Sequence, residues 1–296
     1  MSADTYPTKT LLLGAAGQLG SELVPLLSAR SEVVAVTRDR LDLSQPKQLR
    51  GLVEDVRPDA IVNAAAYTAV DKAEAEPDLA RAVNADAPTA LAAYARDAGI
   101  PLLHVSTDYV FDGSKGSPYR EDDPTGPLGI YGATKLAGER GIRATCDRYG
   151  IVRTAWVYGS RGKSNFVKTM LRLGKDREEL RVVCDQIGSP TWTGDLARAI
   201  AELLPHLNDR DRAGIYHCTN SGVASWYDFA VAIFEEARVL GFPLKIEGVR
   251  AIATHEYPTP AKRPAYSVLD GEKLAGLLGD RLPHWRISLR QMLREF

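Results

Sequence analysis

A tyrosine and a lysine four positions apart are the first residues whose types and spacing could do chemistry. Tyr131 and Lys135 begin and end the segment YGATK, at the start of a helical pattern that runs to about residue 145. Positions i and i+4 share one face of a helix, so a phenol and an ammonium can meet one ligand there. A phenol can donate a proton to the alkoxide that forms when a ketone is reduced. Because this spacing is common by chance, its surroundings must support it.

Hydroxyl and carboxyl side chains follow a predicted buried strand upstream of this pair. Ser106, Thr107 and Asp108 lie at the end of the apolar run 102–106. The carboxyl ends of parallel strands meet at one edge of a sheet, and such sheets bind their ligands at that edge. We therefore expect the hydroxyl of Thr107 to hydrogen-bond the same carbonyl oxygen as Tyr131.

A glycine-rich turn comes directly after the first apolar run and opens the first helical pattern. Gly14, Gly17 and Gly20 give it the spacing GxxGxxG. Glycine lets the backbone approach a pyrophosphate, and the amide groups of a helix N-terminus hold its charge. The turn predicts a dinucleotide site, with a purely structural turn as the alternative.

A bound nicotinamide would also help the tyrosine to act near neutral pH. The ordinary pKa of tyrosine is about 10. A positive charge nearby favours the phenolate, so we expect Lys135 and an oxidised nicotinamide to lower the pKa of Tyr131.

The end of the second predicted strand indicates which dinucleotide is bound. An acid there bonds the ribose 2′-hydroxyl of NAD, whereas an arginine accepts the 2′-phosphate of NADP. Thr37 ends the run 32–37 and Arg38 follows it, while a count of about twenty residues from the glycines selects Asp39. The pattern favours NADPH, with NADH also open and with a solvated loop as the alternative for Arg38.

The elements that must position these residues alternate along the first half of the chain. Apolar runs that predict strands lie at 10–13, 32–37, 60–63, 102–106, 151–157 and 180–184, with helical patterns in most of the gaps. Strands that are apolar throughout are typical of a parallel sheet covered on both faces. The sequence predicts an α/β fold: a Rossmann-like doubly wound parallel sheet with a smaller mixed α/β substrate domain.

The alternation loosens beyond about residue 160. Helical patterns lie at 165–173, 195–204 and 226–240, with a short strand at 215–219 and several prolines after 257. We expect a dinucleotide-binding domain over residues 1–160 with a return segment at about 190–225. The substrate-binding domain would comprise about 161–189 and 226–296.

Composition excludes several classes of partner. The 296 residues carry 37 Lys and Arg against 38 Asp and Glu, so the net charge of −1 offers no basic field for nucleic acid or an anionic membrane. The first residues lack the pattern of a signal peptide, and no apolar stretch is long enough to span a membrane. We therefore expect a cytoplasmic protein with a small-molecule partner. Cys146, Cys184 and Cys218 are too widely spaced for a metal or redox motif, which predicts buried reduced thiols.

Longer motifs identify a family. The chain resembles the extended short-chain dehydrogenase/reductase superfamily, and within it most closely the dTDP-4-dehydrorhamnose reductases. The resemblance covers nearly the whole chain and rests on NAAAYTAVDK (63–72), STDYVFDG (106–113), RTAWVY (153–158), DQIGSPT (185–191) and YPTPAKRP (257–264).

The resemblance implies a reaction and a set of roles. NADPH or NADH would reduce the C4 ketone of dTDP-4-dehydro-β-L-rhamnose to give dTDP-β-L-rhamnose. Tyr131 would donate the proton, Lys135 would bind the nicotinamide ribose and Thr107 would tune the tyrosine. The cofactor contacts it implies are Gly17, Gln18, Leu19, Asp42, Leu43, Ala66, Tyr67 and Thr68. The contacts to the sugar nucleotide are Thr107, Asp108 and Trp156, with plain core as the alternative for Trp156.

Three further points follow from the resemblance. Some relatives share Mg²⁺ at a homodimer contact, but only Glu22 and Glu295 match those acids, and the third position is Gly194. We predict no metal, and a homodimer stays open.

Related dehydratases place a glutamate where this chain has Tyr109, which disfavours dehydration. The alternatives are a reductase of another nucleotide 4-keto-6-deoxysugar and a non-enzymatic regulator that resembles the regulatory subunit of methionine adenosyltransferase.

Overall fold

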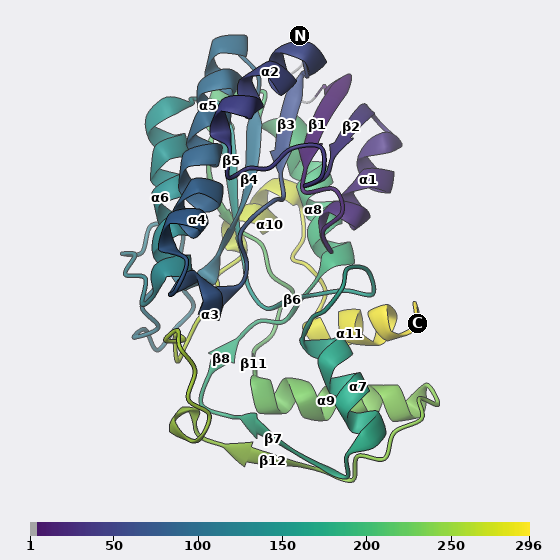
Figure 1. The fold of residues 1–296 in the computed structure, drawn as a ribbon. Coiled ribbons are helices and arrows are strands. Elements are labelled where there is room, and N and C mark those ends of the chain that lie inside the picture. The colour runs from purple at the N-terminus through teal and green to yellow at the C-terminus, as the bar shows by residue number, and fades with distance from the viewer. Residues whose placement is uncertain (1–4) are drawn as a thin grey trace.

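A parallel sheet forms the centre of the computed structural model, which describes residues 5–296 (Figure 1). Residues 1–4, on which the expectation of no signal peptide partly rests, lie outside the described residues. In the described part of the chain the sheet has the strand order β10-β5-β4-β3-β1-β2, and every neighbouring pair is parallel. Its strands are β1 (Lys9–Leu13), β2 (Glu32–Val36), β3 (Ala60–Asn63), β4 (Leu102–Thr107), β5 (Tyr149–Thr154) and β10 (Gly214–His217). This confirms the predicted doubly wound fold.

Helices cover both faces of the sheet, each over its own apolar core. On one face lie α2 (Pro46–Val56), α5 (Ala87–Ala98) and α6 (Ile130–Thr145). On the other lie α1 (Gly20–Ser28), α8 (Thr193–His206) and α10 (Glu272–Leu278). The apolar side of α1 faces the core, since Leu23 and Leu27 are fully buried. With both faces closed, polar side chains reach a ligand at the carboxyl edge of the sheet.

The strand order reverses between β1 and β3, and this reversal leaves a crevice at the carboxyl edge. From β1 the chain moves outward to β2 and then returns across β1 to β3. Doubly wound sheets bind ligands at such a point. Short helical elements border it, namely α3 (Val70–Ala73), α4 (Pro77–Arg81), the π-helical turn η1 (Ala82–Asp86) and the 3-10 turn η2 (Asp108–Val110).

A second apolar core lies beyond the carboxyl edge, at the bottom of Figure 1. Its helices are α7 (Phe166–Asp176), α9 (Trp226–Val239) and α11 (Trp285–Leu293). Short ladders accompany them: β7 (Glu179–Val183) pairs with β12 (Gly248–Ile252), β8 (Ile187–Gly188) with β11 (Ala224–Ser225), and β6 (Val157–Tyr158) with β9 (Thr191–Trp192). The 3-10 turns η3 (Arg210–Arg212) and η4 (Thr254–Glu256) complete the described elements.

Three details differ from the sequence prediction. The run 180–184 forms β7 outside the main sheet, because its partner is β12, 69 positions downstream in register. The run 151–157 is not one strand, since β5 ends at Thr154 and β6 pairs with another segment. Cys146 and Cys218 are buried as predicted, but Cys184 is exposed just past β7. Among residues 5–296, no helix combines the length and the apolar content that a membrane crossing needs.

Helix α6, which carries the Tyr131–Lys135 pair, is held at its start and again at Glu139 within its buried face. At its start, Glu74 accepts a hydrogen bond from the amide of Ile130 at 2.8 Å and so replaces a side-chain cap. Further along, Glu139 accepts from Arg153 of β5 at 2.9 and 2.7 Å, and from Ser106 of β4 at 2.5 Å. Glu139 and Arg153 are both almost fully buried. The ion pair therefore ties α6 to two neighbouring strands.

We predict that Glu139→Gln lowers the free energy of unfolding by about 3–5 kcal/mol, because it leaves the buried Arg153 charge without its partner. Urea unfolding followed by circular dichroism measures the loss. Asp97→Asn is the matched control, since it removes the partner of Arg96 where both side chains are more than half exposed. That change should cost less than about 1 kcal/mol. Equal losses in the two variants would contradict the structural role of the buried pair.

Candidate active site

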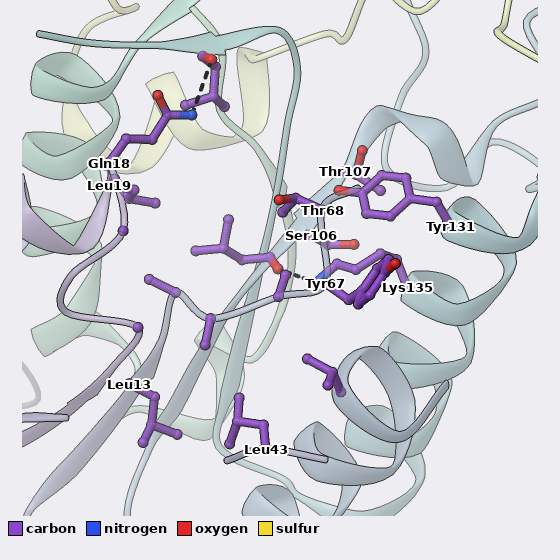
Figure 2. Close-up of a pocket in the computed structure, with 18 of the residues that line it drawn as sticks. Leu13, Gln18, Leu19, Leu43, Tyr67, Thr68, Ser106, Thr107, Tyr131 and Lys135 are labelled. Atoms are coloured by element: carbon purple, nitrogen blue, oxygen red, sulfur yellow. Dashed lines mark hydrogen bonds between the residues drawn. The ribbon is translucent and has the colours of Figure 1, made fainter. Parts of the chain in front are cut away.

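A cavity of about 530 Å³ opens at the point where the strand order reverses. The turn after β1, the loop after β3, the end of β4, the start of α6 and the segment after β5 all contribute to its wall. Figure 2 shows side chains from these segments around the cavity. The volume lies within the range of ligand and cofactor sites in proteins.

The cavity brings together nearly all of the residues that the sequence nominated. The nominated residues in its wall are Gly14, Gly17, Gln18, Leu19, Thr37, Arg38, Asp42, Leu43, Ala66, Tyr67, Thr68, Thr107, Asp108, Tyr131, Lys135 and Trp156. Gly20 is the nominated residue that does not belong to the described wall. The individual contacts of these residues to cofactor and substrate stay predictions.

Close packing explains two of the three glycines in the turn. Gly14 has φ +79°, and a Cβ there would lie 2.7 Å from the amide nitrogen of Ala65. A Cβ on Gly20 would lie 2.1 Å from the carbonyl oxygen of Gly14. Gly20 thus lets the first turn of α1 pack against the loop, and its predicted contact to the cofactor stays a prediction. Gly17 remains in the cavity wall, where its amide also closes the turn onto Gly14 at 2.9 Å.

Tyr131 lies beside Thr107, and the phenol points toward the hydroxyl in Figure 2. Burial raises the pKa of Tyr131 to about 12; the hydrogen bond with Thr107 opposes the rise and the charge of Asp108 adds to it. The predicted lowering of this pKa concerns the site with an oxidised nicotinamide bound and stays a prediction; in the chain by itself the direction is the opposite. The reason is physical: removal from water penalises a phenolate, and Lys135 is not among the groups that shift this pKa.

Lys135 is fully buried and turns toward β4. Its Nζ donates to the carbonyl oxygen of Val105 at 2.6 Å (dashed in Figure 2) and lies 3.0 Å from Nε2 of His104. Burial lowers the pKa of Lys135 to about 8, and the charge of Glu139 opposes the shift. The predicted common face is confirmed, because both Tyr131 and Lys135 enter the cavity wall.

Asp108 is the most perturbed acid of this wall. Burial raises its pKa to about 6, and hydrogen bonds with Ser267 and Thr107 oppose the rise. Thr107 donates to its Oδ1 at 3.1 Å and accepts from the amide of Tyr109 at 3.2 Å. Tyr109 meets the ring of Tyr131 edge to face at 5.5 Å, so it covers that phenol with apolar surface.

Trp156 belongs both to the cavity wall and to the second core. Its indole stacks on Trp226 with ring centroids 3.5 Å apart and planes within 5°. Its backbone has φ +48°, which is rare for a bulky residue and breaks the predicted strand 151–157. A Cβ on Gly188 would lie 2.6 Å from the indole, so this glycine leaves room for the ring. Trp156 is therefore part of the second core, and its contact to the sugar nucleotide stays a prediction.

At the other end of the cavity, Arg38 lies exposed in the wall beside Thr37. Thr37 donates to Asp39 at 2.5 Å, and Asp39 is not among the described lining residues. The basic residue rather than the acid thus faces the cavity. Gln18 connects the glycine turn to the segment after β5 on the opposite side of the cavity. Its side-chain amide donates to the carbonyl oxygen of Val157 at 3.3 Å.

Sequence reasoning missed the apolar part of the wall. Its residues include Leu41, Val70, Leu79, Val83 and Val105. Leu79 and Val83 stand four positions apart, which is the one local signal that could have found them. Leu41 lies in a loop, Val70 begins the short helix α3 and Val105 lies in β4, where no helical period could mark them.

No cluster of three potential metal ligands occurs among residues 5–296. Glu22 and Glu295 lie near each other, since the charge of Glu295 adds to the burial that raises the pKa of Glu22. Arg161 lies 3.4 Å from Glu22 and opposes that shift. The third position of the family's acid set is Gly194, which packs against Trp192.

Known proteins resemble this chain over its whole length. A family model described as the RmlD substrate binding domain matches residues 8–296. The dTDP-4-dehydrorhamnose reductase of Escherichia coli strain K12 is 45% identical over 290 residues, which cover 96% of this chain and 97% of that protein. The spore coat polysaccharide biosynthesis protein SpsK of Bacillus subtilis strain 168 is also 45% identical, over 97% of this chain and 98% of that protein.

Solved structures resemble it as well. A crystal structure of dTDP-4-dehydrorhamnose reductase from Bacillus anthracis strain Ames, in complex with NADP, is 39% identical and superposes with a TM-score of 0.90 over 98% of this chain and 99% of that chain. A UDP-glucose 4-epimerase from Thermus thermophilus in complex with NAD is 22% identical, with a TM-score of 0.80 over 97% of this chain and 98% of that chain. The second likeness concerns the fold alone.

Asp108 gives the site a testable pH dependence. Its folded-state pKa of about 6 exceeds the ordinary value of about 3.9, so the folded protein holds this proton more tightly than the unfolded chain. Stability is therefore lost as the pH rises from about 4 to about 6. Asp108→Asn removes this loss, and its stability relative to the parent should increase by roughly 3 kcal/mol across that window. Urea unfolding at a series of pH values measures the difference. Asp122→Asn, at an exposed loop position, should show no such increase; a flat difference for both variants would refute the buried acid.

Proposed function

The chain belongs to the RmlD substrate binding domain family, and from that premise we propose that it is an NAD(P)H-dependent oxidoreductase of dTDP-L-rhamnose synthesis. It reduces the C4 ketone of dTDP-4-dehydro-β-L-rhamnose to give dTDP-β-L-rhamnose. The observation that carries the proposal is the convergence of Thr107, Tyr131 and the glycine turn on one cavity, in a chain whose full-length relatives are named for this reaction.

The cavity wall suits a nicotinamide dinucleotide. Gly14 and Gly17 present backbone rather than side chain at the start of α1. A pyrophosphate can come close to the backbone amides at a helix N-terminus when no side chain stands in between. The cationic Arg38 at one end of the cavity favours a 2′-phosphate, which supports NADPH as the preferred cofactor, with NADH also accepted. When bound, the cofactor supplies the hydride for the ketone carbon.

Tyr131 is the proposed proton donor. The raised pKa keeps its phenol protonated at neutral pH, which suits an acid in the direction of reduction. Its proton passes to the carbonyl oxygen of the sugar as the carbon is reduced. Thr107 turns its hydroxyl hydrogen from Asp108 and donates it to the same oxygen. Lys135 binds the nicotinamide ribose in this proposal. Tyr109 excludes water from the phenol, and no glutamate stands there to drive an elimination.

The remaining assignments extend this proposal. The domain built around the parallel sheet binds the cofactor, and the domain built around the second core completes the site for the sugar nucleotide. Asp108 and Trp156 lie where the two domains meet. Because a nucleoside diphosphate sugar carries charges that keep it from crossing membranes, we place the enzyme in the cytoplasm. A homodimer is the proposed assembly; cell fractionation and light scattering test these two points.

The direct test incubates the protein with dTDP-4-dehydro-β-L-rhamnose and either NADPH or NADH, follows the cofactor absorbance and identifies the product sugar. Tyr131→Phe keeps the ring but lacks the proton, so turnover should fall by about 10²- to 10⁴-fold while NADPH affinity stays near normal. Tyr109→Phe, which removes the neighbouring phenol, serves as the control and should lose less than about tenfold. If Tyr131→Phe turns over nearly as fast as the parent protein, Tyr131 is not the proton donor. Intact cofactor with tight binding to a partner enzyme would favour the regulator instead.

Cofactor preference can be tested with two arginines of one loop. Arg38 lies in the cavity wall, whereas Arg40 does not belong to the described lining residues. Arg38→Ala should raise the KM for NADPH by about tenfold and change the KM for NADH by less than about twofold, because only NADPH carries the 2′-phosphate. Arg40→Ala should leave both values unchanged. Equal increases for the two cofactors in Arg38→Ala would refute the contact.

A further inference from the structure

Trp156 has a backbone conformation that a bulky side chain does not favour by itself. Its φ of +48° lies in the left-handed region, where residues with a large side chain are rare. Such a conformation persists where the surrounding structure enforces it. One restraint acts on the backbone, because the carbonyl oxygen of Trp156 accepts a hydrogen bond from the amide of Thr191 at 3.2 Å. The other restraints act on the indole.

A short ladder brings two residues against this indole. β8 pairs with β11 so that Gly188 lies opposite Ala224. Trp226 follows β11 directly and stacks on Trp156, with ring centroids 3.5 Å apart and planes within 5°. A Cβ on Gly188 would lie 2.6 Å from the same indole. The bare backbone of Gly188 and the ring of Trp226 therefore form a slot that receives Trp156.

The stack is imposed by the residues around it. Aromatic pairs prefer offset or edge-to-face arrangements, with ring centroids about 4.5–7 Å apart, to a face-to-face pair. Trp156 and Trp226 adopt the less favoured arrangement. The packing around the slot therefore holds the two rings together, as it holds the left-handed backbone of Trp156.

Trp226 is held in place without Trp156. Its neighbour Ser225 caps α9: the Ser225 hydroxyl accepts from the amide of Asp228 at 3.0 Å, and the Asp228 carboxylate accepts from the amide of Ser225 at 2.9 Å. This capping box fixes the first turn of α9, where Trp226 lies. Phe166 at the start of α7 packs on Trp226 with ring centroids 4.6 Å apart. Trp226 can therefore act as a fixed support for the indole of Trp156.

Trp156 transmits this support to the cavity. It is half-buried and belongs to the cavity wall, whereas Gly188 and Trp226 lie outside the described lining residues. We propose that Trp226 is a positioning residue, whose ring holds the indole of Trp156 where it can cover the sugar nucleotide. Without the stack, the backbone at Trp156 can relax to a negative φ and carry the indole away. The inference rests on the proposed function, because that function includes the contact between Trp156 and the substrate.

The first test needs neither cofactor nor substrate and compares the midpoints of urea unfolding. Trp156→Gly should unfold at a higher urea concentration than Trp156→Ala, the reverse of the usual order, because glycine tolerates a positive φ. Trp156→Leu and Trp226→Leu should each lower the midpoint. The double variant should lower it by less than the sum of the two shifts, since both changes remove the same stack.

Trp285 supplies the control for this comparison. It lies in the same core and meets Phe229 edge to face at 5.7 Å. The shifts of Trp156→Leu and Trp285→Leu should therefore add in the double variant. Additive shifts for Trp156 and Trp226, or a Trp156→Ala variant more stable than Trp156→Gly, would overturn the proposal.

The second test asks whether the stack acts on substrate binding. In Trp226→Leu the KM for dTDP-4-dehydro-β-L-rhamnose should rise by about tenfold, while kcat and the affinity for NADPH change by less than about twofold. Trp226→Phe keeps a flat ring and should restore most of the parent value. Trp285→Leu removes an indole from the same core and should leave the KM within about twofold of the parent. An unchanged KM in Trp226→Leu, or an equal rise in Trp285→Leu, would refute the positioning role.

A third comparison shows whether Trp226 acts through Trp156. In the Trp156→Ala background, Trp226→Leu should raise the KM by less than about twofold more, because no indole is left to position. A further rise of about tenfold in that background would mean that Trp226 acts by another route. If Trp226→Leu does not fold, Gly188→Ala displaces the same indole and should give the same rise in KM with kcat unchanged. A parent protein without reductase activity would refute the proposed function and leave the unfolding result standing, whereas additive unfolding shifts in an active enzyme would refute the role of Trp226 alone.

Discussion

The ion pair between Arg153 and Glu139 fixes the helix on which the site depends. Tyr131, Lys135 and Glu139 stand at intervals of four residues, so they share the face of α6 that meets the sheet. Two charges removed from water must keep good geometry, and a shift of α6 along β5 would leave both unpaired. The bidentate contact and the added hydrogen bond from Ser106 satisfy that requirement. The register of α6 against β4 and β5 then brings the phenol and the amine to the cavity.

Exclusion of water acts in one direction on the three buried titratable groups Tyr131, Asp108 and Lys135. It raises the pKa of Tyr131 and Asp108 and lowers that of Lys135. Acids and bases shift in opposite senses, but in each case the uncharged form is the one favoured. At neutral pH the phenol of Tyr131 is uncharged, while the charges of Asp108 and Lys135 are opposite in sign, so this part of the wall carries little net charge. It can therefore accept a ketone oxygen and support the charge that develops there only when the reaction begins.

The sequence predicted the parts of the molecule that local pattern controls. The glycine turn, the strand that ends in Thr107 and the helix from Tyr131 all lie where their periodicity indicated. The partner of β7 could not be predicted, because an apolar run does not record whether it pairs with the sheet or with β12. The raised pKa of Tyr131 in the chain by itself could not be predicted for a related reason: motif chemistry considers the nearby lysine, whereas burial depends on the whole surrounding wall. The contact between His104 and Lys135 joins residues 31 positions apart and left no local signal.

The stack of Trp156 on Trp226 has a spectroscopic consequence. Trp156 follows the last sheet strand before the chain leaves for the second core, and Trp226 begins α9 inside that core. Indoles this close and parallel share their excited states, so the pair should give a coupled near-ultraviolet circular dichroism band and quenched emission, unlike the separate Trp192 and Trp285. The protein thus contains an intrinsic spectroscopic probe of the position of its second core. Any rotation of the second core relative to the sheet would change the overlap of the two rings and could be followed without an attached label.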